Sequence, residues 1–250
     1  MIATLERLRH PAAILLGVGA LGLGILSLVH QDFALQWQPY PQDLPGRSLW
    51  GLASGAAAAT GGALMLAPRY RWFGALVLAV FFALWVVALH VPMVAVRPVN
   101  VGRWNGLAEA LVMAAGAFLV FRESRRAEGR DPMADLAIRA FGAACLVFGG
   151  AHFVYAEFTA SMVPAWLPMR LELAYLTGAV HALTGLAMLI GIGTRRAAAA
   201  EALMMSSFVL LVHLPRVAAA PLDRLELTML CIAATLSGAA WSLAASRSAR

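Results

Sequence analysis

Residues 45–95 read PGRSLWGLASGAAAATGGALMLAPRYRWFGALVLAVFFALWVVALHVPMVA, and residues 168–218 read PMRLELAYLTGAVHALTGLAMLIGIGTRRAAAAEALMMSSFVLLVHLPRVA. The two stretches align without a gap at an offset of 123 residues. Shared positions include the initial proline, an arginine two residues later, several small residues, and the motifs His90-Val-Pro92 and His213-Leu-Pro215. A gapless repeat of this length indicates one structural unit that occurs twice.

The repeat extends more weakly toward the N-terminus of each copy. Arg9-His10-Pro11 resembles Arg130-Asp131-Pro132, and His30 is aligned with His152. We therefore predict two units, residues 1–127 and residues 128–250, that meet in a charged segment around residues 122–131. We expect any functional site where the two copies meet or differ.

Composition predicts that both units lie in a membrane. The chain is 61% hydrophobic and only 13% charged, well outside the range of soluble domains. A soluble protein with buried helices is the alternative, but it rarely has so many long apolar stretches in 250 residues. Each stretch is long enough for a helix to cross about 30 Å of hydrocarbon. We predict an all-α integral membrane protein with two pseudo-symmetric four-helix units and eight spans, at about 11–30, 48–67, 72–93, 104–121, 134–153, 171–193, 197–217 and 224–244.

The arginines predict the orientation of the spans. All 19 basic residues are arginine, and thirteen of them fall on one side of the predicted topology. Cytoplasmic loops carry the excess of positive charge, so both termini are predicted to be cytoplasmic. The net charge of +6 then reflects topology and contact with the lipid bilayer, and we expect no nucleic-acid partner. The six arginines of the outer side are Arg47, Arg97, Arg103, Arg170, Arg216 and Arg224.

Three short motifs of the second unit carry a family resemblance. They are Gly149-Gly-Ala-His-Phe153, Val163-Pro-Ala-Trp-Leu-Pro168 and Leu176-Thr-Gly-Ala-Val-His-Ala-Leu-Thr-Gly185. This pattern resembles the DoxX/DoxD-like family of four-helix bacterial membrane proteins, and each half of the chain resembles one copy. The first half keeps the spacing but has Gln-Pro-Tyr-Pro-Gln-Asp-Leu-Pro45 in place of the tryptophan motif. The resemblance implies a bacterial inner-membrane location.

The resemblance also implies a kind of activity. Members of the family are associated with membrane redox work, including a subunit of a thiosulfate–quinone oxidoreductase, and with soluble thiol or sulfur enzymes as partners. The family often has an acidic residue where His181 stands, so a role of that acid is not carried over to this chain. The cysteines Cys145 and Cys231 lie in different predicted spans without a Cys-x-x-Cys motif, which disfavours a thiol relay. We expect both cysteines to be buried and structural.

Four histidines lie toward the outer ends of their spans: His30, His90, His152 and His213. Histidine can ligate a metal, carry a proton, or donate a hydrogen bond to a quinone carbonyl. These four are therefore candidate ligands of a metal, or of a non-covalently bound haem. The alternative is that each one caps a helix end or bonds a carbonyl group at the membrane interface.

His181 is the one histidine expected deep in the membrane. It lies 11 residues beyond Arg170 and so about 16 Å into its span. An ionisable side chain at that depth is a functional candidate. Its counterpart in the first unit is Ala58, so the two copies differ there. A neutral His181 that bonds only a threonine or a carbonyl group is the structural alternative.

We therefore predict a pocket in the outward half of the second unit, and three classes of function remain open. The first is a DoxX-like redox-associated subunit that binds a quinone or a small sulfur compound. The second is a non-catalytic accessory subunit that docks a soluble redox enzyme or fills a place in a larger membrane complex. The third is a transporter of a small solute or metal. The predicted pocket residues are His152, Trp166, His181 and His213, with Glu157 and Glu172 at its mouth.

Overall fold

The computed structural model describes residues 7–125 and 131–248. Every regular element in these two ranges is helical. The predicted boundary between the units, after residue 127, falls in the segment 126–130 and so lies outside the described residues.

The first half contains four long apolar helical segments. The chain runs through α2 (Arg9–His30), α3 (Arg47–Leu66), α4 (Arg71–Trp85) with its continuation α5 (Val91–Val96), and α6 (Val101–Ser124). A short π-helical turn, Val86–His90, joins α4 to α5, so the third span is one continuous segment. The described loop between α2 and α3 is long and places Phe33 and Trp37 in the core.

The second half has the same order of spans and one additional short helix between the first two. It contains α7 (Pro132–Val154), the short α8 (Ala156–Met162), α9 (Arg170–Ile190), α10 (Thr194–Phe208) with its continuation α11 (Leu214–Ala219), and α12 (Arg224–Ala245). A second π-helical turn, Val209–His213, joins α10 to α11. In the two described ranges, eight segments are thus long and apolar enough to cross a membrane, and their bounds agree with the predicted spans within a few residues. The chain fits a helical multi-pass membrane protein.

Proline explains the π-helical turn that occurs once in each half. Pro92 and Pro215 have no backbone N–H, and a proline ring collides with the carbonyl group four residues earlier in an α-helix. The helix widens by one residue directly before each proline, and the widened turns end at His90 and His213. Such π-bulges are frequent at functional sites. Both histidines are buried, at 2% and 8% exposure.

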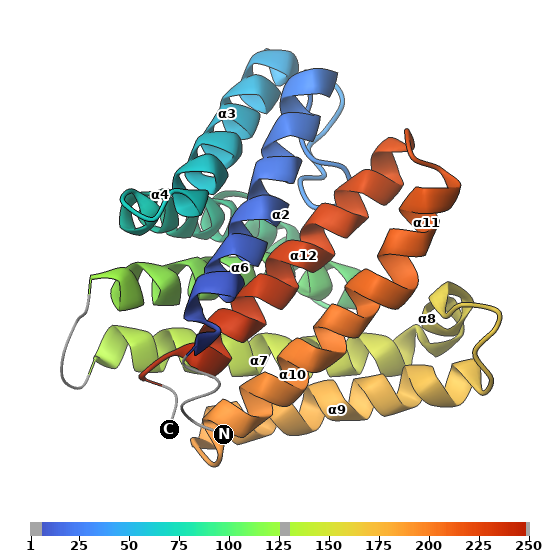
Figure 1. Cartoon of the computed structure of the whole chain (residues 1–250). Coiled ribbons are helices and arrows are strands. Elements are labelled where there is room, and N and C mark those ends of the chain that lie inside the picture. Colours follow the sequence, from blue (N-terminus) through green and yellow to red (C-terminus); the bar gives the residue numbers. More distant parts are fainter. Residues whose placement is uncertain (1–6, 126–130, 249–250) are drawn as a thin grey trace.

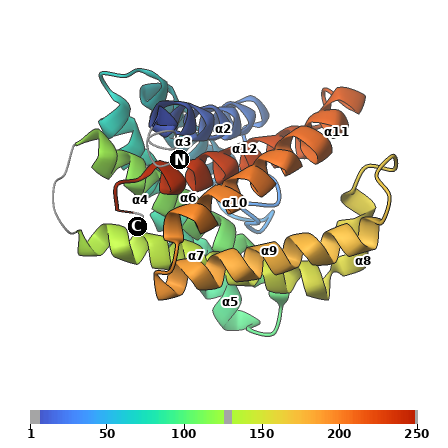
Figure 2. The ribbon, with the colours of Figure 1, turned by 60° about the horizontal axis from the view of Figure 1, so that its bottom comes forward.

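The two halves pack through each other. Helix α2 packs against α3 of its own half and against α12 of the other half, while α7 packs against α9 and against α6. The fourth helices of the halves, α6 and α12, also contact each other. In Figure 1 the α2–α3 pair and the α7–α9 pair diverge from the end where α2 and α7 begin. Figure 2, turned by 60°, shows α12 between the α2–α3 pair and α10.

Glycines set the distance between the first and second helices of each half. A Cβ atom on Gly55 would contact Ser27, and one on Gly178 would lie 2.9 Å from the Cβ atom of His152. Ser27 therefore occupies the place in the first half that His152 occupies in the second. The sequence alignment of His30 with His152 differs from these contacts by three residues, and His30 is exposed at the end of α2.

Arginines bind helix ends at one end of the bundle. The Arg9 Nε atom donates to the Ala245 carbonyl oxygen at 3.0 Å, and Arg195 donates to the Ser246 carbonyl oxygen at 2.9 Å. Arg139, near the start of α7, reaches to the end of α9 and donates to the Leu189 carbonyl oxygen at 2.7 Å. The starts of α2, α7 and α10 and the ends of α9 and α12 thus lie together at this end.

A charged cluster ties the halves together at the opposite end. Asp32, in the loop after α2, accepts from Arg47 Nε at 2.8 Å and lies 3.5 Å from Arg224 Nη1 at the start of α12. Burial alone would raise the pKa of Asp32. Hydrogen bonds from Arg47 and from the Phe33 N–H, together with the two positive charges, outweigh burial, so the pKa lies below its ordinary value. Asp32 is therefore ionised across the physiological pH range.

Candidate site at a buried histidine–glutamate pair

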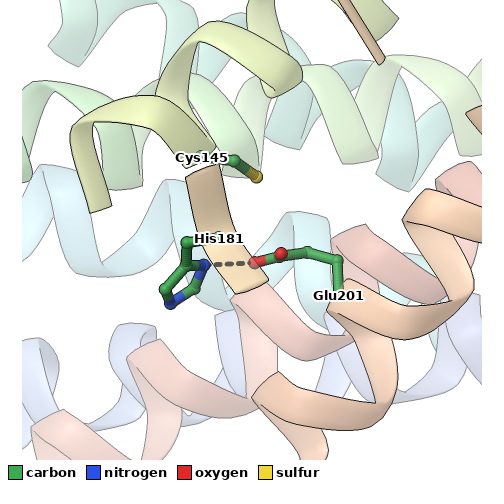
Figure 3. A group of neighbouring side chains, drawn as sticks. All are labelled: Cys145, His181 and Glu201. Atoms are coloured by element: carbon green, nitrogen blue, oxygen red, sulfur yellow. Dashed lines mark hydrogen bonds and ion pairs between the residues drawn. The ribbon is translucent and has the colours of Figure 1, made fainter. Parts of the chain in front are cut away.

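Three polar side chains from three helices meet in the interior of the second half. They are Cys145 of α7, His181 of α9 and Glu201 of α10. His181 Nδ1 lies 2.6 Å from Glu201 Oε1, and the side chains are 3% and 0% exposed. Figure 3 shows the imidazole and the carboxylate facing each other, with the Cys145 sulfur directed toward the carboxylate. The His181 side chain is thus buried among protein atoms, and its partner is an acid on the next span.

Several donors converge on the Glu201 carboxylate. His181 Nδ1 donates to Oε1, and the Thr184 hydroxyl donates to Oε2 at 2.6 Å. The Cys145 sulfur lies beside the same carboxylate, within 4.8 Å of its ligand oxygen. A carboxylate without partners would be very unstable in a membrane interior, and hydrogen bonds to a charged group are the strongest means of stabilising it there. The protein therefore holds Glu201 in a prepared polar site.

The local sequence explains why these residues meet. His181, Thr184 and Met188 lie on one face of α9, together with Gly185. A Cβ atom on Gly185 would come within 2.6 Å of the Gly142 carbonyl oxygen and 2.9 Å of the Cys145 Cβ atom. The absence of a side chain at Gly185 thus allows α9 to approach α7 closely, and this approach brings Cys145 to the His181 face.

His152 lies beside this pair. Its ring is 5.0 Å from the His181 ring, edge to face. The Thr177 hydroxyl donates its single proton to the backbone carbonyl groups of α9, so the His152 Nδ1–H donates to Thr177 Oγ1 at 2.9 Å. Each imidazole thus uses Nδ1 within the protein. Among the described residues, none forms a hydrogen bond with either Nε2 atom.

Aromatic rings enclose the two imidazoles. Phe148 lies 5.5 Å from the His181 ring, and Phe208 lies 6.1 Å from the rings of both His152 and His181. Phe208 is the last residue of α10 before the π-helical turn, so the turn begins directly beside the site. His152 is only partly buried, which leaves one edge of the site near the bundle surface.

The other predicted pocket residues lie elsewhere. Trp166 is 69% exposed in the loop before α9, and Glu157 and Glu172 are exposed at the first turns of α8 and α9. His213 is buried at the end of its π-helical turn, which packs against α12. The structure thus brings together two of the six predicted residues, His152 and His181.

Two other predicted metal candidates lie outside this site. His90 is buried in the first half, with its ring 6.2 Å from the Trp37 ring. His30 is exposed at the end of α2. The four histidines proposed as metal ligands therefore do not converge on one centre.

Sequence reasoning missed Glu201 and Cys145 as site residues. Glu201 lies seven residues into the seventh span, between alanines and methionines, and an acid inside an apolar span is itself a signal of function. Cys145 gave no such signal, because a lone cysteine in an apolar helix is usually a structural residue. In the sequence, Thr184 stands out only as part of the motif Leu176–Gly185.

The first half has an apolar version of the same site. The repeat alignment places Ala58 at the position of His181, Gly61 at that of Thr184, and Leu78 at that of Glu201. The contacts between the first and second helices of each half place Ala20 of α2 at the position that Cys145 occupies in α7. A Cβ atom on Gly61 would lie 2.7 Å from Leu78 Cδ2, so the leucine fills the space that the carboxylate and its threonine fill in the second half.

The three side chains could together hold a metal ion. The Cys145 sulfur, an imidazole nitrogen of His181 and a carboxylate oxygen of Glu201 all lie within 4.8 Å of one another. All three residues are buried. Thiolate, imidazole and carboxylate are the three groups by which proteins hold zinc.

Comparisons with known proteins bear on the second half alone. Residues 141–243 match a protein family described as a domain of unknown function, DUF8561. No curated protein and no solved structure matches the chain. The matched segment begins within α7 and ends within α12, so Cys145, His181 and Glu201 all lie inside the part of the chain that is similar to this family.

Proposed function

We propose that this chain is a DoxX-like, redox-associated subunit of a bacterial inner membrane and that its second unit binds a quinone beside His152 and His181. The chain would consist of two pseudo-symmetric units related by an axis along the membrane normal, with both termini in the cytoplasm. Each part of this proposal rests on a different observation.

Internal contacts support the two-unit arrangement. Helices α3 and α9 begin at Arg47 and Arg170, and the two π-helical turns also begin 123 residues apart. Where α6 contacts α12, Gly116 packs directly against Ala239. Ala239 lies 123 residues later and is therefore the residue equivalent to Gly116 in the second half. Equivalent residues contact each other in this way when they lie close to a two-fold axis.

The arginine-rich end of the bundle supports the orientation. The contacts of Arg9, Arg139 and Arg195 join helix ends from both halves at one end of the bundle. Helices α2 and α7 begin together there, as expected if both units cross the membrane in the same direction (Figure 1). The excess of arginine favours the cytoplasm for this end.

The edge-to-face contact of the His152 and His181 imidazoles is the observation that carries the quinone site. Each ring uses Nδ1 internally and keeps Nε2 for a ligand, and Phe148 and Phe208 provide aromatic surfaces for a planar ring. A quinone head group needs this combination of apolar surface and hydrogen-bond partners for its carbonyl oxygens. The ligand would enter from the lipid past the partly buried His152.

The His181–Glu201 pair would supply protons to the bound quinone. Reduction of a quinone to a quinol takes up two electrons and two protons. The electrons would come from a soluble thiol or sulfur enzyme, the partner class that the DoxX-like resemblance implies. An imidazole and a carboxylate joined by a 2.6 Å hydrogen bond hold an exchangeable proton in the membrane interior. In the doubly protonated imidazole, His181 Nε2 would donate its own proton to a quinone oxygen while Nδ1 keeps its hydrogen bond to Glu201. His152 would assist reprotonation of His181 from the outer side, so that the cycle supplies both protons in turn.

Binding of a short-chain benzoquinone to the purified protein in lipid nanodiscs tests the proposal. His181→Ala removes one hydrogen bond to the quinone and should weaken binding about tenfold or more, since a hydrogen bond to a charged group contributes about 1.5–3 kcal/mol. His90→Ala is the matched control, because His90 is equally buried but lies in the first half. Its quinone affinity should equal that of the wild type.

The same measurement separates the quinone site from a scaffold. Equal quinone affinity of folded His181→Ala and wild-type protein would overturn the proposed site. The absence of measurable quinone binding by the wild type would favour the non-catalytic accessory subunit instead. Co-purification with a soluble redox enzyme would then be the relevant assay.

A further inference from the structure

We propose that Cys145, His181 and Glu201 form a binding site for one divalent metal ion of intermediate softness, with zinc as the representative ion. The site goes beyond the proposed quinone site, because Cys145 has no part in quinone binding. It rests on the geometry of three side chains from α7, α9 and α10.

The ligand atoms lie within about 1 Å of the separations that a tetrahedral site requires. Zinc binds sulfur at about 2.3 Å and nitrogen or oxygen at about 2.0–2.2 Å, so neighbouring ligand atoms lie about 3.3–3.8 Å apart. The three ligand atoms here all lie within 4.8 Å of one another. His181 Nδ1 and Glu201 Oε1, now 2.6 Å apart, would separate by roughly 1 Å as the ion replaces their shared proton.

Charge favours a divalent ion at this depth. A thiolate from Cys145 and a carboxylate from Glu201 carry two negative charges, and a neutral His181 adds none. One divalent cation therefore makes the occupied site neutral, which avoids the large penalty of a net charge in a membrane interior. A monovalent ion would leave one negative charge there.

Ligand chemistry narrows the identity of the ion. Magnesium and calcium prefer sites built only from oxygen, whereas sulfur and nitrogen ligands favour zinc and its neighbours among the transition metals. Three protein ligands leave one tetrahedral position free, as in zinc sites that bind a water molecule or a substrate. Neither Cys145 nor His181 belongs to a local sequence motif of the Cys-x-x-Cys kind, so only the fold brings the ligands together.

Neighbouring groups hold the ligands in place. The Thr184 hydroxyl bonds Glu201 Oε2, which leaves Oε1 directed toward His181 and free to bind the ion. Phe148 and the His152 ring pack against the His181 ring and limit its rotation. Such supporting contacts orient metal ligands and raise the affinity of the site.

Metal binding would release two protons. One proton leaves the Cys145 thiol, and the other is the proton shared by His181 and Glu201. The divalent ion takes their place, so the total charge of the site does not change. The affinity for the metal should therefore increase as the pH rises.

Metal titration of the purified protein tests the site. The protein is first treated with a chelator, and elemental analysis then measures zinc retained after gel filtration, while cobalt serves as an optical probe of thiolate ligation. We expect one metal ion per chain and a sulfur-to-cobalt charge-transfer band. Cys145→Ala should lose the band and weaken binding at least 100-fold. Cys231→Ala is the matched control, since it removes the other cysteine, and should bind metal as the wild type does.

The outcomes separate this proposal from the quinone site. No stoichiometric zinc in the wild type, or unchanged zinc and cobalt binding in folded Cys145→Ala, would overturn the metal site. Cys145→Ala should keep the quinone affinity of the wild type, so loss of metal binding with intact quinone binding supports the assignment. Failure of quinone binding in a protein that still takes up one zinc ion would overturn the quinone site alone.

Discussion

Replacing His181 and Glu201 by the residues of the first half is the most direct test of the buried pair. The first half has Ala58 and Leu78 at the equivalent positions. We therefore consider His181→Ala, Glu201→Leu and the double variant. The three proteins form a double-mutant cycle with the wild type, which isolates the interaction between the two side chains.

The distance between the two side chains sets the expected magnitude. With the shared proton on His181, the two side chains carry opposite unit charges 2.6 Å apart, which attract by about 6 kcal/mol at an effective dielectric constant of about 20. Much of this attraction offsets the loss of hydration, but removal of one partner leaves the other buried alone. His181→Ala should thus lower the free energy of unfolding by about 3–5 kcal/mol. Glu201→Leu leaves a neutral imidazole without its partner and should lower it by about 1–3 kcal/mol.

The double variant should be more stable than the sum of the single effects predicts. It has no uncompensated charge, and its main defect is the cavity left by the imidazole, about 2 kcal/mol. The coupling free energy should therefore be at least about 2 kcal/mol. Reversible unfolding in mixed detergent micelles, followed by tryptophan fluorescence and circular dichroism, measures it. Single effects that add within about 0.5 kcal/mol would refute a coupled ion pair.

Three further predictions concern the rest of the fold. Arginines hold the pKa of Asp32 below its ordinary value, so the stabilising effect of this carboxylate is complete above about pH 4 and is lost as the pH falls through the folded-state pKa. In urea titrations, Asp32→Asn should lower the free energy of unfolding by about 1–2 kcal/mol at pH 7 and by less at pH 3. An equal loss at both pH values would contradict this account. Gly116→Leu should prevent close contact of α6 with α12 and reduce the yield of folded protein, measured as the monodisperse peak in size-exclusion chromatography. Gly150→Leu is the control, because the structure has open space there, and it should give the yield of the wild type. Equal yields of the two variants would argue against tight packing at the α6–α12 contact. Reporter fusions should read cytoplasmic at Gly193 and periplasmic at Gln42, and the reverse result would overturn the proposed orientation.

The spans were predictable because a membrane imposes a strong constraint on sequence. A spanning helix must be apolar for about 20 residues, and this property is visible without any knowledge of packing. The depth of His181 was predictable for the same reason, because residue spacing in a helix converts directly into distance. The depth itself stays a prediction, whereas the 3% exposure shows that the side chain faces other helices.

The partner of His181 was not predictable, because it depends on how the helices rotate about their axes. Glu201 lies 20 residues further along the chain, on a helix whose facing side is set by packing. The sequence also offers the acids Glu157 and Glu172 near the same end of the bundle as candidates, but the structure places both on exposed helix starts. The alignment of His30 with His152 was wrong for a similar reason, because it matched two histidines by residue type. The glycine contacts between helices instead match Ser27 with His152.

Helix spacing explains why the polar site exists in one half only. In the first half, a Cβ atom on Gly74 would lie 2.5 Å from the Met65 nitrogen, so α4 and α3 touch through their backbones. The equivalent residue in the second half is Ala197, whose methyl group requires α10 to stand further from α9. That wider gap accommodates the Glu201 carboxylate and its donors. The polar residues and the small change in packing thus depend on each other. Moving the His181–Glu201 pair into the first half would require replacement of Gly74 as well.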